Sequence, residues 1–141
     1  MRLPLYLHKR FVKKVVGYSV PMYWHKNTND NWAAWVNTSR IKDKSIYLAE
    51  SFREYSITEQ RVMLLHECGH LSTKIDYKSI VKSEFNADKW AINRASELGL
   101  EEELKILKEW VGIWSRNKSS WNTSHRRYIL AARMTQEHGV T

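Results

Sequence analysis

The sequence predicts an α+β fold in which a short three-stranded sheet packs against a series of helices. Segments with a strand pattern lie between residues 18 and 50, whereas helical spacing and helix-capping residues dominate from residue 56 onward. Hydrophobic residues make up 43% of the 141 residues, which is enough to bury a core. Neither an internal repeat nor a Gly-, Pro- or Ser-rich linker divides the chain, so we expect a single domain over residues 1–141.

The first part of the chain is expected to form one helix and three strands. Apolar side chains recur at helical spacing over Leu5–Val16, which predicts an amphipathic helix that ends near Gly17. Tyr18–His25 and Asn31–Thr38 have the composition of strands, and the residues between them favour a turn. The alternation of side chains in Lys44–Glu50 predicts the third strand.

The rest of the chain has the signals of four helices. Ser56 and Glu59 have the spacing of a capping box, which predicts that a helix begins there and runs to about Ser72. Three further helices are expected over residues 83–98, 101–114 and 123–137. Gly99 has the position of a helix terminator between the first two of these.

The net charge of +8 is concentrated at the two ends of the chain. Residues 1–29 hold six Lys and Arg side chains and no acidic one, and residues 110–136 hold five basic side chains and no acidic one. This asymmetry indicates either an acidic partner, which can be nucleic acid, anionic lipid or an acidic protein, or a basic face exposed to solvent. The chain has no apolar run long enough for a transmembrane segment.

The cysteine content bears on the cellular compartment. Cys68 is the only cysteine in the sequence, so the chain cannot form an internal disulfide, and it has no secretory signal pattern at its N-terminus. Both observations favour a reducing, cytoplasmic location. We expect Cys68 to be a buried apolar residue and not a metal ligand, because helical spacing directs it away from the neighbouring histidines.

Residues 66–70 form an H-E-x-x-H motif in the helix that follows the strands. At about 100° per residue, His66 and His70 lie within roughly 40° of each other on one helix face, so both imidazoles can bind one zinc ion. Glu67 lies about 100° from His66, beside the metal, where it can accept a proton from a zinc-bound water.

A second motif, E-x-x-x-D, begins fourteen residues after His70. Glu84 can complete a set of three zinc ligands, and Asp88 on the same helix face can accept the outer ring N–H of a ligand histidine. Gly69 would leave the site uncrowded, and Ala87, which is small and adjacent to the face of Glu84 and Asp88, would permit close packing of the two helices.

Both motifs together are specific. At the His and Glu frequencies of this chain, H-E-x-x-H arises by chance in about two of a hundred sequences, and adding E-x-x-x-D reduces this to roughly one in a thousand. The alternative is that these are exposed polar residues on two ordinary helices.

In these two motifs the chain resembles the gluzincins, zinc metallopeptidases in which H-E-x-x-H is followed by a glutamate ligand. The resemblance covers Ser45–Ser96, and this region is most similar to compact intracellular members of the ImmA/IrrE type. It implies a zincin-like fold, with Zn²⁺ bound by residues 66, 70 and 84 and with Glu67 as catalytic base. It also implies that residues 43–49 lie at the edge of the cleft and bind the substrate backbone as an added strand.

A second electrophile would stabilise the tetrahedral oxyanion of peptide hydrolysis. His125 is the favoured catalytic candidate, because its helix could fold back over the cleft. The other candidates, for each of which surface or core packing is the alternative, are Tyr77, Arg126, Arg127 and Tyr128.

We therefore expect a zinc metallopeptidase that hydrolyses a peptide bond in a protein or peptide substrate through a zinc-activated water and Glu67. One alternative is a zinc-bearing module that recognises nucleic acid or an acidic protein through its basic ends without hydrolysis. Another is a peptidase that its basic surface recruits to a target. The oligomeric state is left open.

Overall fold

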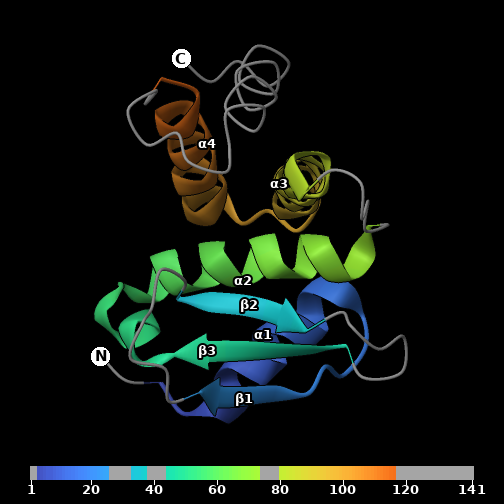
Figure 1. Ribbon diagram of the computed structural model, residues 1–141, viewed down its shortest axis with the longest axis vertical. Coiled ribbons are helices and arrows are strands. Elements are labelled where there is room, and N and C mark those ends of the chain that lie inside the picture. Colours follow the sequence, from blue (N-terminus) through green and yellow to red (C-terminus); the bar gives the residue numbers. More distant parts are fainter. Residues whose placement is uncertain (1–2, 26–32, 38–43, 74–79, 117–141) are drawn as a thin grey trace.

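The computed structural model describes residues 3–25, 33–37, 44–73 and 80–116 (Figure 1). Their elements, in chain order, are α1 (Leu5–Val16), β1 (Met22–His25), β2 (Ala34–Asn37), β3 (Ser45–Ala49), the 3-10 helix η1 (Glu50–Glu54), α2 (Ile57–Ser72), α3 (Ile80–Glu97) and α4 (Glu101–Arg116). The α+β class is thereby confirmed. The helix expected over residues 123–137 lies outside the described residues. In the described part of the chain, no helix has the length and apolar content needed to cross a membrane.

The strands form one sheet in the order β1-β3-β2. β1 runs parallel to β3, and β2 runs antiparallel to it. Tyr47 of β3 is therefore paired with Tyr23 on one side and with Trp35 on the other.

The central place of β3 corrects one expectation. The gluzincin resemblance implied that residues 43–49 lie at the edge of the cleft, but β3 has a hydrogen-bonded strand on each side. β3 is central because β2 pairs with one of its edges and β1 pairs with the other. A peptide therefore cannot add to β3 as a further strand.

The helices and the sheet are arranged in layers (Figure 1). α1 lies across one face of the sheet, and α2 lies between the sheet and the pair formed by α3 and α4. The core joins these layers through side chains that are at most 1% exposed, among them Val12, Ile46, Leu48, Leu64 and Leu107. Since neighbours surround α2, it buries residues on several sides and offers a rigid base for the motif that it carries.

The N-terminal end of α2 is fixed by the predicted capping box. Ser56 Oγ accepts a hydrogen bond from the backbone N–H of Glu59 at 3.1 Å, and the Glu59 carboxylate accepts one from the backbone N–H of Ser56 at 3.1 Å. The amide of Gln60, which is 1% exposed, donates to the carbonyl oxygens of Phe52 and Tyr55 at 3.1 and 3.0 Å. These bonds join α2 to η1 and hold the entry of the helix in place.

Candidate metal centre

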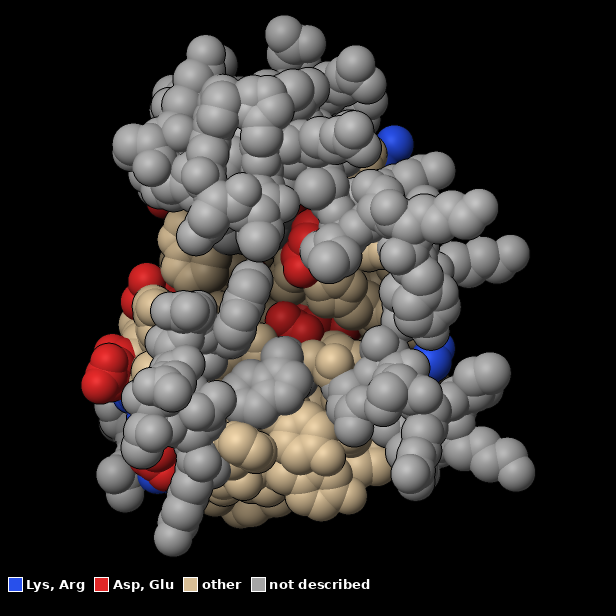
Figure 2. All heavy atoms as spheres, in the orientation of Figure 1, with Lys and Arg blue, Asp and Glu red and all other residues tan. Residues whose placement is uncertain are grey.

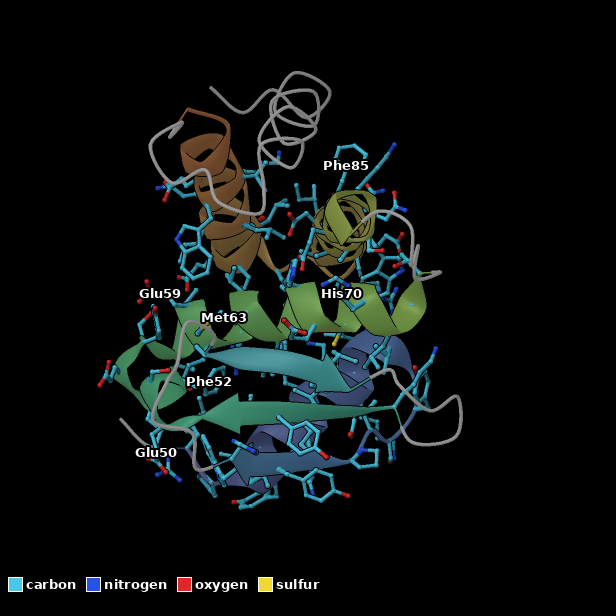
Figure 3. All side chains as sticks on the ribbon, viewed as in Figure 1. Glu50, Phe52, Glu59, Met63, His70 and Phe85 are labelled. Carbon is cyan, nitrogen blue, oxygen red and sulfur yellow. The ribbon has the colours of Figure 1, made fainter. Side chains whose placement is uncertain are left out.

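Two helices bring the predicted metal ligands together. His66 and His70 lie on α2, and Glu84 lies on α3. One ligand atom from each of the three residues lies within 4.8 Å of the other two, so the group can hold a metal ion. His70 is on the side of α2 that faces α3 (Figure 3).

The distances between the donor atoms show how closely they converge. His66 Nε2 lies 2.8 Å from Oε2 of Glu84, and His70 Nε2 lies 3.2 Å from the same oxygen. The two Nε2 atoms are 3.1 Å apart, and the two rings stand at 90° to each other. The carboxylate and both ring nitrogens are therefore directed at one small volume, as the ligands of a single cation must be.

The site is accessible from solvent. The side chains of His66, His70 and Glu84 are 15%, 18% and 16% exposed. Acidic side chains are visible in a hollow near the centre of the face shown in Figure 2. The three ligand side chains are therefore partly exposed, and a metal ion can reach them from solvent.

Asp88 contacts Nδ1 of His66, the ring nitrogen that does not face Glu84. Its side chain is 2% exposed, and its Oδ1 lies 2.5 Å from His66 Nδ1. The acceptor of this bond is a carboxylate, so the Nδ1–H of His66 donates to it, and Nε2 is the ring nitrogen that faces Glu84. Asp88 thus contacts the histidine that it was predicted to orient, and its role in fixing the tautomer stays a prediction.

The pKa of His66 reflects two opposing influences. Burial alone lowers it, but the charge and hydrogen bond of Asp88, together with those of Glu84, outweigh burial and raise it well above 6.5. Without a metal ion, the two carboxylates therefore favour the form of His66 that carries a second ring proton. A divalent cation would take the place of that proton.

Glu67 is buried at 7% exposure beside this group. Burial raises its pKa to about 7, because the positive charges of His66 and His70 compensate only part of the desolvation. A carboxyl group that titrates near neutral pH can both accept and release a proton during a reaction. Its neighbour Cys68 is fully buried, as expected, and burial raises the pKa of its thiol.

Two residues that the motifs did not indicate support the end of α2 that carries His70. Thr73 Oγ1 donates to the carbonyl oxygen of Gly69 at 2.8 Å, and Lys44 Nζ donates to that of Leu71 at 3.3 Å. The last carbonyls of a helix have no partner within the helix, so these side chains satisfy part of that need. For Thr73 the signal was its position directly after the last turn, whereas the contact of Lys44 depends on tertiary packing.

The remaining candidates for catalysis lie outside the described residues, and they are Tyr77, His125, Arg126, Arg127 and Tyr128. Their roles stay predictions.

No protein-family model, curated protein or solved structure matches the chain. The functional interpretation therefore rests on the geometry of the site itself.

Proposed function

We propose that the chain is a zinc metallopeptidase of the gluzincin type, with a zincin-like fold, that hydrolyses a peptide bond in a protein or peptide substrate. The observation that carries this proposal is the convergence of His66, His70 and Glu84 from two helices, with Glu67 buried next to them. A site that serves structure alone has no need of a further carboxyl group with a pKa of about 7 at this position.

The donor set fits zinc. Two imidazoles and one carboxylate are a common set in catalytic zinc sites, which keep a fourth position open, whereas structural sites use four protein ligands. When bound, zinc would supply a Lewis acid that polarises the scissile carbonyl group and acidifies a water molecule.

The protein groups then have separate tasks. Glu67 accepts the proton of the attacking water and delivers it to the leaving amine, for which its pKa of about 7 is well suited. Asp88 keeps His66 in the tautomer that presents Nε2 to the site.

For the substrate backbone, we propose β2 instead of β3. Among the described residues β2 is hydrogen-bonded only to β3, so its other edge can pair with an extended peptide. β2 also contacts α2, the helix that carries the motif (Figure 1). A peptide on this edge would therefore run beside the ligand-bearing helix.

The test combines metal content with cleavage. Protein purified without added metal is expected to hold about one zinc per chain by mass spectrometry, and Glu84→Ala is expected to lose most of it. The zinc-loaded chain is then incubated with a mixture of peptides from digested cell protein, and new termini are identified by mass spectrometry. A folded wild-type chain that binds no zinc when zinc is offered would refute the proposal.

One observation favours a second candidate, a module that binds an acidic partner. The exposed side of α1 carries Lys9, Arg10, Lys13 and Lys14, and α1 contains no acidic residue. Binding of nucleic acid that weakens steeply with salt, without cleavage of any peptide, would support this function instead.

A further inference from the structure

Gly69 of α2 lies directly against the backbone of Ala87 of α3. A Cβ atom added at Gly69 would lie 2.8 Å from the Cα and the carbonyl carbon of Ala87, and closer still to its carbonyl oxygen. Real Cβ atoms essentially never come within 3.0 Å of another heavy atom in this way. All three atoms belong to the backbone, so no change of rotamer could relieve the clash.

The backbone angle does not explain the glycine. Positive φ occurs only at Gly17 and Gly99 among the described residues, so Gly69 has an ordinary helical conformation. Glycine inside a helix is about 1 kcal/mol less favourable than alanine. What requires it here is the close approach of the two helices.

This contact lies in the middle of the candidate metal centre. Gly69 is three residues after His66 and one before His70, and Ala87 is three residues after Glu84 and one before Asp88. The contact thus occupies the same place between the two functional residues of each helix. The separations of 2.8 and 3.2 Å between Glu84 and the two histidines depend on how closely the backbones approach at this point.

We propose that Gly69 is a positioning residue of the metal centre, which sets the distance between α2 and α3 at which His66, His70 and Glu84 can share one ion. The inference rests on the metal site of the proposed function. A methyl group at Gly69 would have to move α3 away by a distance on the order of 1 Å to reach ordinary contact. Metal–ligand distances tolerate only about 0.2 Å, so the displaced Glu84 would coordinate poorly.

The experiment measures zinc affinity by competition with a chelator, using the full chain. Gly69→Ala is expected to keep the helical circular dichroism of the metal-free protein and to bind zinc about 10- to 100-fold more weakly, the range for groups that orient metal ligands. The absorption spectrum of bound Co²⁺, which reports ligand geometry, should change as well. The double variant Gly69→Ala/Ala87→Gly should not recover affinity, because the clash involves backbone atoms that glycine retains.

Gly99→Ala is the matched control. Gly99 has φ of +68° and would meet no atom within 4 Å, so alanine there strains the backbone without moving α3 against α2. It should lower the melting temperature and leave zinc affinity unchanged. This separates general destabilisation from displacement of the ligands.

Each outcome is decisive. A wild-type chain that binds no zinc would refute the proposed function, whereas equal affinity of wild type and Gly69→Ala would refute this inference alone. Recovery of affinity in the double variant would also overturn it, since the side chain of Ala87 would then set the spacing.

If Gly69→Ala is unfolded in buffer, the titration is repeated in trimethylamine N-oxide, which favours the compact state. A variant that remains unfolded there with zinc would contradict a role confined to the ligands.

Discussion

The buried carboxylate of Asp88 on α3 accepts a hydrogen bond from Nδ1 of His66 on α2 at 2.5 Å. The bond crosses between the two helices that carry the ligands, and it leaves Nε2 of His66 at 2.8 Å from Glu84. One ring is therefore held from both sides by residues of the same E-x-x-x-D motif. The orientation of this ligand is set before any metal binds.

Asp88→Asn should weaken zinc binding. The amide keeps nearly the same shape but lacks the charge that raises the pKa of His66 and the basicity of its Nε2. We expect a loss of about 10- to 100-fold in zinc affinity, measured by chelator competition. Glu97→Gln, on an exposed residue of the same helix, serves as control and should bind zinc like the wild type. Equal affinity of Asp88→Asn and the control would show that the carboxylate does not act on His66.

Glu67→Gln should separate metal binding from catalysis. The amide side chain of this variant has nearly the same size as the carboxylate but cannot accept a proton at neutral pH. We therefore expect wild-type zinc content with a loss of at least about 100-fold in the rate of peptide cleavage. Undiminished turnover in this variant would remove Glu67 from the mechanism.

The stability of the metal-free protein should fall as pH rises from 6.5 to 8.5. The folded state raises the pKa of His66 well above 6.5, so His66 binds a proton more tightly than in the unfolded chain and carries most of this effect. It raises the pKa of Glu67 from 4.5 to about 7, so most of the contribution of Glu67 is already lost between pH 4.5 and 7. Such groups stabilise the fold fully below their unfolded pKa, and this contribution is lost as pH rises through the folded value. Thermal melts of chelator-treated protein across this range test the sign.

The stabilisation of the protein by zinc should increase with pH, in contrast to the stability of the metal-free protein. Zinc binds the deprotonated forms of its ligands, so its affinity rises with pH, and the increase in melting temperature caused by zinc should grow between pH 6.5 and 8.5. If zinc raises the melting temperature by the same amount over this whole range, the metal does not displace a proton from His66.

Much of the site could be predicted from the sequence because it depends on spacing within helices. The capping box at Ser56 and Glu59 fixed the start of α2, and the period of 3.6 residues placed His66 and His70 on one face. The same period placed Glu84 and Asp88 together on α3. What spacing cannot supply is the distance between helices, which here follows from the contact of Gly69 with Ala87.

The strand order was the part that the sequence could not supply. Alternation assigns side chains to the two faces of a strand but does not say which strands are neighbours. In the order β1-β3-β2, β1 pairs with β3 and not with β2, its neighbour in sequence, and the expectation that residues 43–49 form a cleft edge was wrong for this reason. The contact of Lys44 with the end of α2 joins residues 27 positions apart in the sequence, so local spacing could not predict it either.

A further titratable group, far from the ligands in sequence, should affect stability in acid. His8 of α1 is 3% exposed and packs edge-on against Phe52, with ring centroids 5.2 Å apart. Burial, and to a smaller extent the charge of Arg61, lowers its pKa below 6.5. Its contribution to stability is therefore present above pH 6.5 and is lost as pH falls through the lowered folded value. His8→Leu removes the group that must be protonated and keeps an apolar side chain in the core. Between pH 6.5 and 5, the melting temperature of this variant should fall less than that of the wild type. An equal fall in both proteins would rule out His8 as the cause.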